Sequence, residues 1–238
     1  MHWRDLLIGH MAFCYAEPRA LYYDHYMKTK NWEKWADSVP LEEVKKLFNF
    51  IVRWDYHFQG DSQKFVEIYE KVSPIIQSLK NARLEDLDLD NDQVSDGIEQ
   101  VFDSICDCSW KYESTDTSKI LHTIVPDLFM MWDRKIRKRI LGDVERNWGA
   151  VYAVDFLPKM QKEVNDCISS FMLEKQNGRA EATDGIRGLC DHKSLPKLID
   201  EFNYMVCTRP KDFLAFIEDL KTRGEISPVD YERIAQKV

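Results

Sequence analysis

The residues best suited to chemistry lie in residues 118–140, which read SKILHTIVPDLFMMWDRKIRKRI. Lys119 and His122 are three residues apart, so on one helix they share a face. Asp133 comes where the next helix is expected to begin, and a carboxylate there accepts backbone hydrogen bonds and lies at the positive end of the helix dipole. A desolvated lysine can lose its proton and act as a nucleophile, and a nearby carboxylate can act as a base or stabilise a cation. If a turn at Pro126 joins the two helices, Lys119 and Asp133 flank one cleft.

The same residues also fit a purely structural interpretation. In that interpretation Asp133 is only a helix cap, Lys119 is exposed and His122 is a core residue with its hydrogen bonds satisfied. We rank Asp133 first and Lys119 second as catalytic residues, and we expect His122 to lie in the core.

A run of cations follows Asp133 directly. Residues 134–139 hold five cations in six positions, in a chain whose net charge is −8. Such a local reversal of sign is typical of a surface that contacts phosphates, because the chain as a whole should repel nucleic acid. The candidate nucleic-acid-binding residues are Arg134, Arg137, Lys138 and Arg139. The alternative is a solvated helix face whose cations pair with Asp127, Asp143 and Glu145.

Two further patterns resemble metal sites, and we interpret both as structural. Residues 88–99 carry acidic side chains at calcium-loop spacing, but Gln93 stands where the sharp turn needs glycine, so we expect Asp96 and Glu99 to cap the next helix. Cys106 and Cys108 lie on a predicted helix, where alternate residues point about 200° apart and suit one zinc ion poorly. We therefore expect no metal and reduced structural cysteines.

The elements that must position these residues are helices. Apolar residues recur at helical spacing along most of the chain, no segment alternates with period two, and there are only 9 glycines and 8 prolines. Residues 1–37 are rich in aromatic side chains, and we expect them to form a helical arm that packs on the core. We expect helices to start at Ser38 and at Asp96, and we expect Pro74 to kink or divide the helix that contains it. Residues 177–188 contain three glycines and are expected to form a loop. Later helices are expected over 195–206 and 211–221, with Gly224 capping the second and Ser227 opening the last.

Composition favours a globular, all-α, compact multi-helix protein. The chain of 238 residues is 44% apolar and 12% aromatic, enough for one large domain over 1–238, with a division into lobes 1–92 and 93–238 as the alternative. No apolar run approaches the roughly 20 residues that span a bilayer, so we expect no membrane partner. The first residues do not resemble a secretion signal, and we expect a cytoplasmic protein with six reduced cysteines.

The order of these features resembles the core of the helix-hairpin-helix DNA glycosylase superfamily. In its members a hairpin precedes a helix that carries a lysine in bifunctional enzymes, and an aspartate opens another helix after a short apolar stretch. Here residues 98–108 match the first hairpin helix, 110–117 the hairpin, Lys119 the lysine, and 131–134 the segment with the aspartate. The pattern SK-x-LH…P-x-LF…WD is also similar to a set of uncharacterised prokaryotic proteins near this superfamily.

The resemblance implies cleavage of an N-glycosidic bond in nucleic acid. A damaged base would be flipped into the cleft, Lys119 or a water would attack the sugar C1′, and Asp133 would stabilise the cationic sugar or deprotonate the nucleophile. Arg134, Lys138 and Arg139 would hold phosphates of DNA, and Trp110 or Trp132 would stack on a base. No cysteine quartet follows the core, so no iron–sulfur cluster and no other cofactor is expected.

Two other functions stay open on the sequence. The expected hairpin residues 114–117 contain no glycine, and Asp116 stands where a phosphate should bind, which favours a non-catalytic nucleic-acid-binding protein on the same scaffold. A helical adaptor that binds a protein partner through the aromatic N-terminal arm is the third class.

Overall fold

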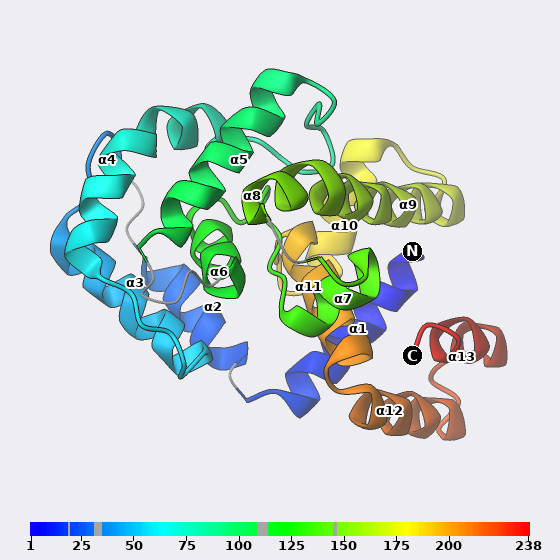
Figure 1. Ribbon diagram of the computed structural model, residues 1–238. Helices are drawn as coiled ribbons and strands as arrows, with labels where there is room; N and C mark the ends of the chain where they lie inside the picture. Colours follow the sequence, from blue (N-terminus) through cyan, green and yellow to red (C-terminus); the bar gives the residue numbers. More distant parts are fainter. Residues whose placement is uncertain (19, 31–34, 109–113, 145–146) are drawn as a thin grey trace.

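Helices account for the regular structure, and the described residues contain no β-strand. The computed structural model describes residues 1–238 except 19, 31–34, 109–113 and 145–146 (Figure 1). The first helices are α1 (Trp3–Ala16), α2 (Ala20–Thr29), α3 (Leu41–Trp54), α4 (Ser62–Leu79), α5 (Asp92–Cys106), α6 (Ser114–Ile124) and α7 (Arg134–Leu141). They are followed by α8 (Trp148–Ala150), the π-helical segment η2 (Val151–Phe156), α9 (Leu157–Lys175), α10 (Arg179–Leu189), α11 (Leu195–Cys207), α12 (Pro210–Thr222) and α13 (Pro228–Ala235). The all-α prediction is confirmed.

Local end signals placed several helices correctly. Asp133 is the N-cap of α7, and its side chain accepts a hydrogen bond from the amide of Ile136. Ser227 caps α13 in the same way ahead of Pro228, and Gly224 ends α12 with a φ of 71° that favours glycine. Each of these residues determines the helix end through contacts within one turn of chain, so tertiary packing has little influence on where the helix ends.

Three local predictions were wrong. The glycines of 177–188 do not make a loop, because α10 runs through most of that range and Gly185 lets the ring of Phe171 approach the helix closely. Asn91, not Asp96, caps α5, so Asp96 lies inside the helix. Pro40 rather than Ser38 is the N-cap of α3.

Pro74 does not divide its helix. α4 continues through it from Ser62 to Leu79. A proline inside a helix removes one backbone hydrogen bond, and apolar packing of this helix compensates, since Val72 and Ile76 on either side are almost fully buried.

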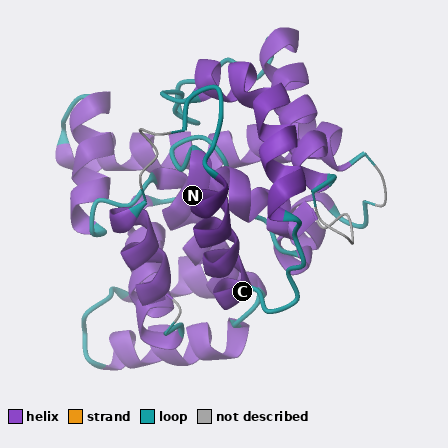
Figure 2. Cartoon of the chain, turned by 90° about the vertical axis from the view of Figure 1, so that its left-hand side faces the viewer, coloured by secondary structure: helices purple, strands orange, loops and turns teal. Residues whose placement is uncertain are grey.

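The helices pack in two groups with α6 and α7 between them (Figure 1). α4 packs on both α3 and α5, and α1 packs chiefly on α11 with further contacts to α9, α12 and α13. α1 therefore joins elements from opposite ends of the chain across the alternative lobe boundary at residue 92. The buried apolar side chains form one cluster that extends from Trp3 to Ile234. Figure 2 shows the same helical layers from the side of α4.

The segment between α6 and α7 is held inside this core. Trp132 is fully buried, its indole Nε1–H donates to the carbonyl of Ser114 at 3.0 Å, and its ring contacts those of Phe102, Tyr152 and Phe156. The Tyr152 hydroxyl donates to the carbonyl of Met130 at 2.6 Å and accepts from its amide at 2.8 Å. These contacts fix the backbone that carries Asp133. Within the described residues, no helix combines the length and apolar character needed to cross a membrane.

Candidate functional site

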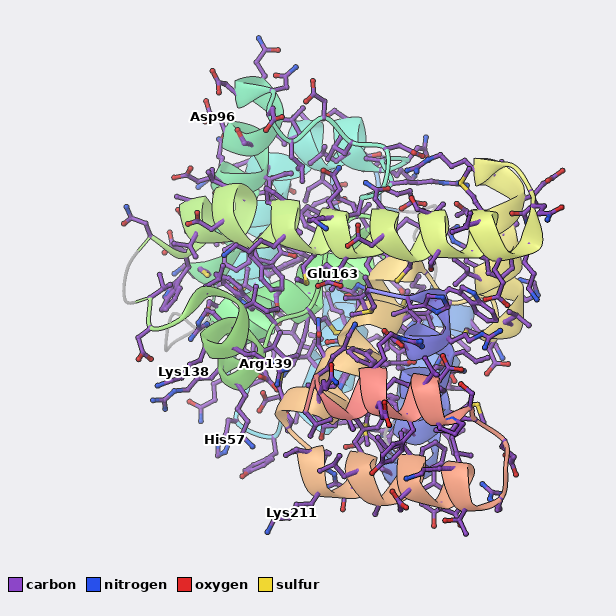
Figure 3. All side chains as sticks on the ribbon, turned by 90° about the vertical axis from the view of Figure 1, so that its right-hand side faces the viewer. His57, Asp96, Lys138, Arg139, Glu163 and Lys211 are labelled. Carbon is purple, nitrogen blue, oxygen red and sulfur yellow. The ribbon has the colours of Figure 1, made fainter. Side chains whose placement is uncertain are left out.

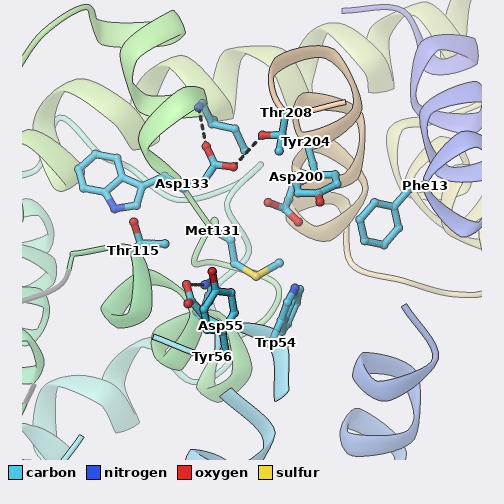
Figure 4. A pocket seen from close by; sticks show the side chains of 13 residues that line it. Phe13, Trp54, Asp55, Tyr56, Thr115, Met131, Asp133, Asp200, Tyr204 and Thr208 are labelled. Carbon is cyan, nitrogen blue, oxygen red and sulfur yellow. Dashed lines mark hydrogen bonds and ion pairs between the residues drawn. The ribbon is translucent and has the colours of Figure 1, made fainter. Parts of the chain in front are cut away.

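A cavity of about 280 Å³ lies between the end of α3, α6, the segment before α7, and α11 (Figure 4). Both predicted catalytic residues line it, so the structure brings Lys119 and Asp133 to one space. The other lining residues are Phe13, Trp54, Asp55, Tyr56, Thr115, Met131, Trp132, Ile136, Asp200, Tyr204 and Thr208. This volume is slightly below the usual range of ligand pockets, roughly 300–1,000 Å³, and suits a ligand with one ring system.

Asp133 has a fixed orientation at one end of the cavity. Its Oδ1 accepts from the amide of Ile136 at 2.8 Å, and its Oδ2 accepts from the hydroxyl of Thr208 at 2.9 Å. The first bond comes from the local helix start, and the second joins the segment to the end of α11. A carboxylate held this way meets developing positive charge without having to reorient.

Lys119 lies toward the other end of the cavity, where it is largely buried and paired with carboxylates. Its Nζ is 2.7 Å from Asp55 Oδ2 and 3.5 Å from Asp116 Oδ1, and its side chain is 12% exposed. Burial raises the pKa of Asp55, but the charge and hydrogen bond of Lys119 outweigh it and leave that pKa below its usual value. Asp55 and Lys119 therefore form an ion pair, and Asp55 is the nearest acceptor for the proton that the amine must lose before it can act as a nucleophile.

His122 is a core residue, as the structural interpretation has it. Its ring is fully buried, Nδ1–H donates to the carbonyl of Phe129 at 2.7 Å, and Nε2 accepts from the hydroxyl of Tyr23 at 2.8 Å. Burial lowers the pKa of His122 to about 3, against the opposing effect of the Phe129 hydrogen bond. The imidazole is consequently neutral and does not line the cavity.

The predicted cationic residues of α7 divide into two kinds. Arg134, Lys138 and Arg139 are exposed, and Figure 3 shows Lys138 on the outer side of α7 and Arg139 on the side toward α13. Lys138 pairs with Asp143 at 2.9 Å, and the guanidinium of Arg139 donates to the carbonyl of Lys237. Arg137 is half-buried instead: it lies 4.2 Å from the ring centre of Trp148 and donates to Ser114 Oγ at 2.8 Å. Of the carboxylates expected to pair with this helix, Asp127 pairs with Arg187 instead, and Glu145 lies outside the described residues.

The expected hairpin is described only in part. Residues 109–113, including Trp110, lie outside the described residues, and 114–117 form the first turn of α6. Asp116 is 3% exposed and lies beside Lys119, so it does not stand at the surface where a phosphate would approach. Trp132 lines the cavity but is fully buried among other rings, which makes it a packing residue.

Neither candidate metal pattern forms a site. No group of three or more His, Cys, Asp or Glu side chains that could hold a metal occurs among the described residues. Residues 92–99 are helical, which removes the calcium-loop geometry. Burial raises the pKa of Cys108 to about 12.

Two carboxylates that line the cavity, Asp55 and Asp200, are not among the residues predicted from the sequence. Asp55 follows α3, 64 residues before its partner Lys119, and no local pattern connects them. Asp200 lies in the middle of α11, where its Oδ2 is 3.0 Å from Lys197 Nζ. A signal for it was present: Lys197, Asp200 and Glu201 share one face of a helix that is otherwise mostly apolar.

Comparison with known proteins identified no relative of this chain. A scan against family models, a search of curated proteins and a search of solved structures each found no match. Inference about function therefore depends on the cavity and its surroundings.

Proposed function

We propose that this protein acts on nucleic acid as a glycosylase-like enzyme, cleaving the N-glycosidic bond of a base placed in the cavity. The observation that carries the proposal is the position of Asp133. It lines the cavity together with Lys119 and is also the N-cap of α7, whose exposed side is cationic. One residue thus connects a reactive space to a surface suited to phosphates.

The walls of the cavity support a planar ligand. Trp54, Tyr56, Phe13 and Tyr204 contribute aromatic groups to the lining, and aromatic faces stack favourably on bases that have left the duplex. Carboxylates at both ends can accept hydrogen bonds from the edge of a base or stabilise a cationic sugar.

The residues divide the chemistry as follows. As the glycosidic bond breaks, Asp133 faces the positive charge that develops on the sugar ring. The C1′ carbon is then attacked by water, or by Lys119 after its proton has passed to Asp55. Arg134, Lys138 and Arg139 hold the phosphates on either side of the extruded nucleotide.

A second candidate function is non-catalytic binding of nucleic acid. The observation that favours it is the pairing of Lys119 with Asp55 at 2.7 Å, because an ion-paired ammonium group is not a nucleophile. In this function the cavity holds a base, and the chemistry has been lost.

The decisive experiment measures base release from a panel of lesion-bearing duplexes and single strands. Asp133→Asn is the informative variant, since asparagine is also a good N-cap and α7 should persist. We expect it to reduce release by about 10²-fold or more, the range for a lost charge or acid–base group. Asp184→Asn, which changes an exposed carboxylate on α10, is the matched control and should retain full activity.

Lys119 has its own test. Borohydride reduction traps the covalent adduct that forms when a lysine has attacked C1′, and Lys119→Ala should abolish trapping. Trapping that persists in this variant would exclude Lys119 as the nucleophile. Retention of nucleic acid at low salt without base release would favour the second candidate, and no retention at all would exclude both.

A further inference from the structure

A second carboxylate lines the cavity near Asp133. Asp200 projects from α11 with a side chain that is 10% exposed, and Figure 4 places it with Asp133 and Thr208 at one end of the cavity, away from Asp55. Its Oδ2 contacts Lys197 Nζ at 3.0 Å, which leaves Oδ1 as the oxygen suited to carry a proton.

The partner of Asp200 is an unusually enclosed lysine. Lys197 is fully buried, and its ammonium group lies 4.6 Å from the ring centre of Phe13, 5.0 Å from that of Tyr23 and 5.1 Å from that of Trp54. These rings come from three helices, so α1, α2 and α3 together hold the cation in place. Aromatic faces stabilise an ammonium group that has lost its water.

On the side of Lys197 away from Asp200, a carboxylate is followed by two further cations. Lys197 Nζ is 3.5 Å from Glu201 Oε1, and Glu201 in turn contacts Lys193 at 3.0 Å and His10 at 2.7 Å. Glu201 is thus surrounded by three cations, of which Lys193 also pairs with Asp24 and His10 with Asp191. Lys197 consequently supports Asp200 without leaving an isolated charge in the interior.

We propose that Asp200 is the proton donor of the cavity, protonating the departing base as the N-glycosidic bond breaks. The inference rests on the proposed function and names the acid that this function needs. Lys197 is a positioning residue, since it acts on the reaction only through Asp200.

The bond between C1′ and the base nitrogen breaks with its electron pair on the base, and Asp200 transfers its proton to a ring nitrogen or carbonyl oxygen of that base. The carboxylate that remains is stabilised by the adjacent Lys197. Water adds to C1′, and the proton that it releases passes to Asp133. Exchange with solvent then restores both carboxyl groups, so the net reaction is hydrolysis to free base and a sugar hemiacetal.

The environment of Asp200 supports proton exchange near neutral pH. Burial raises its pKa and Lys197 lowers it, with the nearby carboxylates adding to the increase, and the result is about 6. The charged groups that face it are Lys197 and Glu201 on its own helix, Asp133 ahead of α7, and Asp55 with Lys119 across the cavity. A proton donor must be protonated to act, so base release should fall tenfold per pH unit as the pH rises beyond about 6.

The test is the pH profile of single-turnover base release between pH 5 and 8, for the wild-type protein, Asp200→Asn and Asp184→Asn. Asp200→Asn should lower release roughly 10²-fold at pH 5 and remove the decline above pH 6, while Asp184→Asn should match the wild-type profile. Lys197→Met should move the decline to higher pH, because the cation that lowers the pKa of Asp200 is gone. If Lys197→Met does not fold, titration of the Asp200 carboxyl carbon by NMR in the wild-type protein replaces it and should show a midpoint near pH 6.

The outcomes separate the two proposals. Base release by Asp200→Asn with an unchanged rate and pH profile overturns the role of Asp200 and leaves the proposed function standing. A midpoint for the Asp200 carboxyl below pH 4.5 does the same. Absence of base release by the wild-type protein on every substrate and at every pH overturns the proposed function, and the role of Asp200 with it.

Discussion

The burial of His122 can be tested through the pH dependence of stability. In the folded protein its pKa is lowered to about 3, whereas in the unfolded chain it returns to about 6.5. As pH falls below 6.5 the unfolded chain takes up a proton that the folded protein refuses, so folding stability is lost progressively until pH approaches 3. With 1.36 kcal/mol for each unit of pKa difference, the loss from this residue between pH 7 and pH 5 is roughly 2 kcal/mol.

The assay is urea unfolding of the wild-type protein and His122→Gln at both pH values. At pH 7 the variant should be less stable by about 1–3 kcal/mol, because a buried hydrogen-bonding group of Tyr23 or Phe129 loses its partner. The variant has no imidazole to protonate, and other titrating groups cancel in the comparison. The stability difference between the two proteins should therefore narrow by roughly 2 kcal/mol at pH 5. A difference that stays constant would show that His122 does not have the buried, neutral environment described above.

Three further outcomes are expected. Gly185→Ala should lower the free energy of unfolding by about 1–3 kcal/mol, because the new Cβ would lie 2.9 Å from the Phe171 ring. Gly188→Ala, whose nearest atom would be 3.9 Å away, should leave the free energy of unfolding unchanged or raise it by up to ~1 kcal/mol. Equal effects of the two variants in thermal unfolding would contradict this packing. Burial lowers the pKa of His10, but its bonds to Cys14 and Glu201 outweigh this and raise it to about 9. The contribution of protonated His10 to folding stability should be complete below pH 6.5 and lost as pH rises toward 9. The stability difference between wild type and His10→Gln in urea unfolding should therefore shrink over that range, and a difference that grows would show that the pKa of His10 is not raised. Lys138→Gln and Arg139→Gln should each reduce the salt dependence of nucleic-acid binding by about one unit of slope, whereas Arg137→Gln should chiefly lower the Tm; a reduced slope without loss of Tm in Arg137→Gln would contradict its packing role.

The parts of the fold that sequence predicts well are those decided within a turn of chain. Asp133, Gly224 and Ser227 each mark a helix end, because capping depends on a side chain or φ angle and its immediate neighbours. Gly185 misleads for the opposite reason. It is present to let Phe171 approach α10, and that cause lies on another helix.

The candidate site divides in the same way. The α6–turn–α7 connection predicts that Lys119 and Asp133 approach one space, because the segment between them is short. The partners that set their chemistry come from elsewhere: Asp55 follows α3, while Asp200 lies on α11. Charge on an apolar helix indicates that Asp200 has an unusual environment, but only the packing of three other helices shows what that environment is.

The pairing of α1 with α11 determines the order in which the molecule can be completed during synthesis. α1 is synthesised well before its main partner, α11, which ends only at Cys207. During that interval α4 can pack on α3 and α5, whereas the main packing partner of α1 has not yet been synthesised. Phe13 on α1 and Asp200 on α11 both line the cavity, so the pocket closes only when the two meet. The site thus cannot form until α11 has been made, and a chain halted before α11 would present the cationic helix without the cavity beside it.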